Sequence, residues 1–458
     1  MAESRLIARH AGTVLVGQLA TMAFGVADTL IAGRYADTAL AALSVGAAIY
    51  ISVFVALMGT VQALLPIWAE LHGAGRPAAI GPSVRQALYL CGASMGVGIA
   101  VLLAPGPLLQ ATGVPPALQP EVRHYLAVLA WALPPALLFR LYSTLNQSLG
   151  KPRLVTWLQL GALAVKVPLS ILLAFGWDGP GPQLQPAGLA GCAWATVAVN
   201  YALVGVAMWL LRTSDLYRPY AIWRPLEPPD GRALAAFLRL GLPSGLAILV
   251  EVTSFTLMAL FIARQGTAAL AGHQIAANVA AVLYMLPLSL GIATSARVSY
   301  WLGAGDPARA RHAAATGLAL GIGCALALAG GLLLLRHSVA ALYAANPRIA
   351  LLAGGLLAWV ALYHTADAVQ AICVFVLRCY RVTVSLLIVY AVLLWGVGLG
   401  GGWLLAYRGL GGVDAQWSPA AFWATSAGAL ALTACIFCTI LWRVVKRPAQ
   451  PPAEPVPL

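Results

Sequence analysis

Three residues in otherwise apolar stretches have the types and spacing of a cation site: Glu251, Tyr363 and Asp367. Tyr363 and Asp367 are four residues apart, so on a helix they share one face. At 1.5 Å per residue, Glu251 lies about 21 Å and Asp367 about 17 Å from the expected ends of their stretches, so the two carboxylates can meet. Two carboxylates and a phenol in a low dielectric either share a proton or hold a cation such as Na⁺. The alternative is two acids that are protonated permanently and hydrogen-bonded separately.

The first half of the chain carries a second pair of opposite charges, Asp28 and Lys166. Lys166 lies about 18 Å into its stretch, too deep for its stem to carry the ammonium fully to an interface. Asp28 is the acid available among the apolar stretches of this half, so we predict an internal ion pair. The alternative for Asp28 is a local hydrogen bond near a helix end.

Membrane helices are the elements that these residues require. The chain is 61% hydrophobic and 9% charged, whereas soluble proteins carry about 25% charged residues. Its apolar runs are continuous and about twenty residues or longer, which is typical of spanning helices and not of the alternating strands of a barrel. We predict an all-α polytopic membrane protein with twelve transmembrane helices.

A repeated motif indicates that the chain is a duplication. Gly73-Ala-Gly-Arg-Pro-Ala78 recurs as Gly303-Ala-Gly-Asp-Pro-Ala308, and residues 38–42 match 268–272 at the same offset. Each copy then holds six spans, so we expect two six-helix lobes related by a pseudo-two-fold axis along the membrane normal. Secondary transporters bind their substrates in the cleft between such lobes.

The expected organisation has four parts. They are an N-terminal lobe (1–211), a cytoplasmic linker (212–236), a C-terminal lobe (237–447) and a Pro-rich, disordered tail (448–458).

The net charge of +13 is explained by basic loops that orient the protein in the membrane, and it does not indicate binding of nucleic acid. The basic residues concentrate in the short loops on the side of the two termini, which predicts that both termini are cytoplasmic. We expect a monomer in a bacterial inner membrane. The seven cysteines are scattered and show no metal-binding spacing.

These features together resemble the multidrug and toxic compound extrusion (MATE) family, over nearly the whole chain. The matching segments are 26–29, 66–75, 188–196 and 272–278. Tyr363 and Asp367 keep the family's Tyr-x-x-x-Asp spacing, and Glu251 falls at the glutamate of the NorM-like branch. The resemblance implies export of organic cations driven by Na⁺ or H⁺.

By the same resemblance, Glu251, Tyr363 and Asp367 form the coupling-cation site of the C-terminal lobe. Asp28 is the corresponding carboxylate of the N-terminal lobe, and Thr196 a lesser member of that site. The sequence departs from the family where Lys166 and Ser170 replace asparagine-type residues. We hypothesise that the Lys166–Asp28 pair replaces the cation site of this lobe. Candidates for lining the substrate cleft are Gln274, Asn278, His273, Asn200 and Thr196.

We therefore expect a secondary antiporter that works by alternating access, with no cofactor beyond the coupling Na⁺ or H⁺. Its partners are small organic cations or amphipathic compounds and the lipid bilayer. No P-loop is present, so ATP is not the direct fuel. A flippase of lipids or lipid-linked oligosaccharides is the alternative, supported by Lys166 and Arg140. No HExxH or GxSxG motif points to an enzyme.

Overall fold

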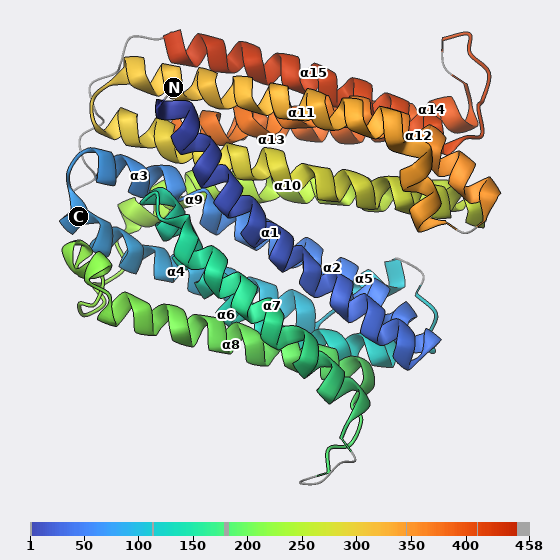
Figure 1. The fold of residues 1–458 in the computed structure, drawn as a ribbon, viewed down its shortest axis with the longest axis horizontal. Helices are drawn as coiled ribbons and strands as arrows, with labels where there is room; N and C mark the ends of the chain where they lie inside the picture. Colours follow the sequence, from blue (N-terminus) through green and yellow to red (C-terminus); the bar gives the residue numbers. More distant parts are fainter. Residues whose placement is uncertain (1, 112–113, 178–182, 345, 410, 447–458) are drawn as a thin grey trace. The chain divides into compact units, whose positions relative to one another are not determined.

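The computed structural model describes residues 2–111, 114–177, 183–344, 346–409 and 411–446. Within these residues the fold is built from helices (Figure 1). Twelve of the described helices are long and apolar enough to cross a membrane, which confirms the predicted fold class. The predicted disordered tail, 448–458, lies outside the described residues.

The spanning helices begin and end as follows: α1 (Ala2–Tyr35), α2 (Asp37–Gln62) continued by α3 (Leu65–Gly73), α4 (Ile80–Leu103), α6 (Gln119–Ser148), α7 (Pro152–Phe175), α8 (Gly188–Thr213), α9 (Gly231–Ala263), α10 (Thr267–Gly303), α11 (Pro307–Tyr343), α12 (Pro347–Cys379), α13 (Val384–Tyr390) continued by the π-helical η3 (Ala391–Gly400) and α14 (Gly401–Tyr407), and α15 (Pro419–Lys446). The shorter elements are η1 (Pro77–Ala79), α5 (Gly106–Ala111) and η2 (Asp215–Tyr220).

Local sequence signals place several helix starts. Prolines occupy the first turns of α7, α11 and α12, where the missing N–H has no intrahelical partner to lose. The side chains of Asp306 and Asn346 accept hydrogen bonds from the backbone N–H groups of Arg309 and Arg348, and so cap α11 and α12. Helix α12, which carries Tyr363 and Asp367, is therefore fixed at its start by its own sequence.

The internal repeat is visible in the turns that end α3 and α10. The N–H of Gly75 donates to the carbonyl of His72 at 3.2 Å, and the N–H of Gly305 donates to that of Leu302 at 3.1 Å. Both glycines have a positive φ, 65° and 73°, which a side chain would strain. The repeated motif therefore encodes one turn twice.

The chain divides into two compact units, one of residues 16–245 and the other of residues 2–15 with 246–446. The units differ from the expected lobes (1–211 and 237–447) at α1 and α9. Arg297 of α10 donates two hydrogen bonds to the Glu3 carboxylate, at 2.7 and 2.9 Å, and holds the start of α1 in the second unit. Gly241 and Gly245 lie against Thr60 of α2, so the first half of α9 packs in the first unit.

The segment expected as a linker is docked against α4. The buried Arg85 donates through Nε to the Glu227 carboxylate at 2.6 Å, through Nη2 to the other Glu227 oxygen, and through Nη1 to the Ala221 carbonyl at 2.6 Å. Gln86 and Tyr89 donate to the carbonyls of Pro228 and Glu227, both at 2.8 Å. These contacts fix the segment that leads into α9.

Replacing Arg85 by Gln is expected to destabilise the protein by about 1–3 kcal/mol, because it removes the donors of a partly buried carboxylate and of backbone carbonyls. The hydrogen bonds from Arg85 hold the pKa of the Glu227 carboxyl below its ordinary value. A lowered pKa stabilises the fold above the unfolded-state pKa, and this stabilisation is lost as the pH falls through the folded-state value.

Thermal unfolding in detergent checks the loss of stability in Arg85→Gln at pH 7. The same measurement between pH 7 and about pH 4 checks the pH dependence that the Glu227 carboxyl contributes. Glu227→Gln should lower the unfolding temperature at pH 7 and flatten its fall toward acid pH. A wild-type and a Glu227→Gln profile that run parallel over the whole range would contradict it.

Candidate functional site

The two carboxylates predicted to meet, Glu251 of α9 and Asp367 of α12, interact electrostatically in the second unit. Asp367 is buried, with 3% of its surface exposed, whereas Glu251 is half-buried. Among the described residues, the Glu251 side chain has no hydrogen-bond or ion-pair partner. The structure therefore places two acids within electrostatic range of each other. Asp367 has a hydrogen-bond partner, and Glu251 has none among the described residues.

Asp367 is held by a short chain of polar side chains. Gln370 donates through Nε2 to Asp367 Oδ1 at 2.8 Å, and the hydroxyl of Tyr390 donates to Gln370 Oε1. All three side chains are buried. Gln370 thus engages one carboxylate oxygen and connects it to α13.

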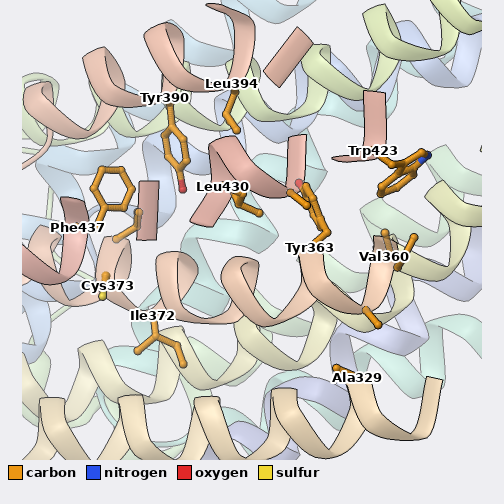
Figure 2. Packing of buried hydrophobic residues seen from close by; sticks show 14 of the residues in the cluster. Ala329, Val360, Tyr363, Ile372, Cys373, Tyr390, Leu394, Trp423, Leu430 and Phe437 are labelled. Atoms are coloured by element: carbon orange, nitrogen blue, oxygen red, sulfur yellow. The ribbon is translucent and has the colours of Figure 1, made fainter. Parts of the chain in front are cut away.

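Tyr363 lies in an aromatic cluster of the second unit that includes Trp423 (Figure 2). Its ring meets Phe255 edge-on at 5.8 Å between centroids and Trp423 at 5.8 Å. It interacts electrostatically with both Asp367 and Glu251, and it has no hydrogen bond to either. The phenol is therefore near the acids, with its orientation set by aromatic packing.

The part of α9 that carries Glu251 is tied to the π-helical segment η3. The indole Nε1 of Trp395 donates to the Val250 carbonyl at 3.2 Å, one residue before Glu251. Further along α9, the Tyr407 hydroxyl donates to the Phe261 carbonyl at 2.7 Å. Segments of π-helix occur often at functional sites, and here the segment positions the backbone beside the half-buried Glu251.

The donor set suits a hard cation or a proton. Carboxylate and phenol oxygens are the ligands that hard cations prefer. No group of three or more His, Cys, Asp or Glu residues that could hold a metal ion occurs in the described part of the chain.

In the first unit, Lys166 of α7 and Asp28 of α1 form an ion pair, with Nζ 2.5 Å from Oδ1. Lys166 also donates to Ser170 Oγ at 2.9 Å and to the Cys192 carbonyl at 3.3 Å. An ammonium has three donors, so all of them are used. Thr196 donates to the same Cys192 carbonyl at 3.0 Å, which joins it to this network.

The candidates for the cleft fall into two groups. Gln274 and Asn278 are exposed on one face of α10, and Asn200 is half-buried on α8. His273 is buried, with its ring 5.8 Å from that of Trp423, so it belongs to the aromatic packing and not to an accessible face.

Sequence reasoning missed Gln370 and Tyr390, which form the hydrogen-bonded chain to Asp367. It also missed Tyr284 and Arg378, which interact electrostatically with Glu251. Gln370 and Arg378 had a detectable signal, because they lie 3 and 11 residues after Asp367 and so fall on one helix face. Tyr284 and Tyr390 had no such signal in the sequence, since their position near the acids depends on how α10 and α13 pack.

Comparisons with known proteins place the chain in a family. A sequence model of the MatE family matches residues 14–172 and 243–404. A relative from Aromatoleum aromaticum, named a probable multidrug resistance protein NorM, is 40% identical over 440 residues, 96% of this chain and 94% of the relative. The multidrug resistance protein PmpM of Pseudomonas aeruginosa is 35% identical over 406 residues, 88% of this chain and 84% of PmpM.

Solved structures share the fold. The eukaryotic MATE transporter AtDTX14 matches with a TM-score of 0.84 at 17% identity, over 97% of both chains. The Vibrio cholerae MATE transporter VcmN in its bent form matches with a TM-score of 0.81 at 18% identity, again over 97% of both chains.

Proposed function

Because the chain belongs to the MatE family of transporters, we propose that it exports hydrophobic or cationic drugs and toxic metabolites in exchange for Na⁺ or H⁺. It is a multi-pass membrane protein and a transporter, not an enzyme. The relatives named as multidrug resistance proteins support the drug-export part of this proposal.

The observation that carries the coupling proposal is the contrast between the acids of the two units. Asp28 is neutralised by an ammonium whose three donors are all used. Glu251 has no such partner within the described residues and lies in range of Asp367. A carboxylate inside a membrane is by default a candidate for an ion or substrate pathway, so Glu251 and Asp367, with Tyr363 nearby, are the proposed coupling site.

Coupling follows from charge balance under alternating access. With both termini cytoplasmic, as the basic loops favour, Na⁺ or H⁺ enters from outside and neutralises the acidic pair. Binding of the cation and of the organic substrate then favour different conformations, and each ligand shifts the equilibrium only by its difference in affinity. The exposed Gln274 and Asn278 of α10 are proposed to contact the substrate.

The flippase alternative rests on free cations that would bind a lipid pyrophosphate. Lys166 is not free, since Asp28, Ser170 and the Cys192 carbonyl accept its donors. Arg140 is buried within α6. The drug antiporter is therefore the better-supported function.

Transport of ethidium, a fluorescent organic cation, tests the proposal. The purified full-length protein in proteoliposomes should move ethidium when a Na⁺ or a pH gradient is imposed, and protein-free liposomes should not. Absence of ethidium movement under both gradients would contradict the export function.

A further inference from the structure

Arg378, in the last turn of α12, is a buried cation with unused donors. Its side chain is 3% exposed, and Nε and Nη1 have no hydrogen-bond partner among the described residues. The guanidinium lies over the ring of Phe375, 4.8 Å from its centroid. Burying a charge without a partner is costly, so this arrangement calls for a compensating negative charge.

The negative charge available to it is the acidic site. Groups that act electrostatically on Arg378 are Tyr390, Tyr284, Glu251 and Cys379, of which Glu251 is the carboxylate. No ion pair joins Arg378 to Glu251 within 4 Å. The guanidinium and the carboxylate are therefore in range of each other without contact.

The geometry of α12 directs Arg378 toward the site. Helical side chains lean toward the helix N-terminus, and the Arg378 guanidinium accordingly lies over Phe375, in the preceding turn. One face of α12 carries Asp367, Gln370 and Arg378, because Gln370 follows Asp367 by 3 residues and Arg378 follows Gln370 by 8. Arg378 thus lies between Asp367 and the end of α12.

A purely structural role at the helix end is a weaker explanation, because the repeat-related turn does without a cation. The N–H of Arg381 donates to the Arg378 carbonyl at 3.0 Å, and the N–H of Gly150 donates to the Gln147 carbonyl at 3.1 Å. Arg381 and Gly150 both have a positive φ, 61° and 69°, so the turns correspond. The neutral Gln147 is buried at the position equivalent to Arg378.

We propose that Arg378 is the built-in counter-cation of the acidic site, which competes with the coupling cation for the negative charge of Glu251 and lets that cation leave. This inference rests on the proposed function. Arg378 acts on the coupling cation only through the charge of Glu251, so it is a positioning residue. When the coupling cation departs, the fixed guanidinium limits the cost of the bare carboxylate.

The variant Arg378→Gln tests the competition, since it introduces the side chain that the repeat-related turn already holds. In proteoliposomes, the concentration of Na⁺ or of H⁺ that half-saturates ethidium transport should fall about tenfold, which corresponds to about 1.4 kcal/mol. Arg378→Lys should keep the wild-type value, because it keeps the charge. Arg381→Gln, an exposed arginine three residues later, is the matched control and should not change it.

A second neutral variant, Arg378→Met, separates charge from shape and covers the case that Arg378→Gln does not fold. Equal decreases in both neutral variants support the inference. An unchanged or increased half-saturating concentration in the neutral variant that folds overturns it, provided that the wild type responds to the gradient and Glu251→Gln does not. If the wild type shows no gradient-driven transport, the proposed function itself fails instead.

Discussion

Replacing Glu251 by Gln should abolish cation-driven ethidium transport, with a loss of about 100-fold or more. Gln keeps the size of the side chain and removes the charge that a cation must neutralise. The expected coupling energy of 1–3 kcal/mol between sites corresponds to about 5–150-fold, and removal of the coupling ligand forfeits all of it. Ethidium binding without a gradient, measured by fluorescence polarisation, should persist because the acidic site is distinct from the exposed face of α10.

The control is Asp215→Asn, which removes a carboxylate that is 84% exposed and paired with Arg218 at 2.9 Å. It should transport as the wild type does. Gradient-driven transport that survives in Glu251→Gln would show that coupling does not use this acid. Asp367→Asn is then the next variant to measure, since Asp367 is the second member of the pair.

Replacing Lys166 by Met should have the largest effect on stability, a loss of about 3–5 kcal/mol, because it leaves Asp28 as a buried charge without a counter-charge. Lys166 is fully buried and Asp28 is 8% exposed. The double variant Lys166→Met with Asp28→Asn removes both charges and should recover most of the loss. Thermal unfolding of the purified variants in detergent checks this non-additivity.

The same variants test whether cation coupling uses the acids of the second unit and not Asp28 of the first. If the Lys166–Asp28 pair has replaced a cation site, the double variant should retain cation-driven transport, while Glu251→Gln loses it. A double variant that folds and has lost its dependence on the gradient would show that Asp28 takes part in coupling. Retention of wild-type stability by Lys166→Met alone would show that the ion pair is not what holds Asp28.

The site residues that the sequence predicts are those that are unusual in an apolar stretch or that follow the period of a helix. Glu251 and Asp367 stood out because carboxylates are rare in apolar stretches, and their depths followed from the rise of a helix. Tyr363 followed from its spacing of four. Gln370 and Arg378 lie on the same face of α12 and were overlooked, because a glutamine or a terminal arginine is common at such positions.

The sequence by itself determined that the chain is a twelve-helix membrane protein, because continuous apolar runs have one stable form in a bilayer. It also determined the repeat, because Gly75 and Gly305 are read directly from the chain, and the pairing of Lys166 with Asp28 was predicted by elimination. Only the tertiary structure decided what surrounds each charge. Helix packing brings Tyr390 to Gln370, and all three donors of Lys166 are used. It leaves Glu251 without a direct partner in the part of the chain that the structure describes. Which donors remain unused depends on side-chain geometry across helices distant in the chain, and no local pattern encodes it.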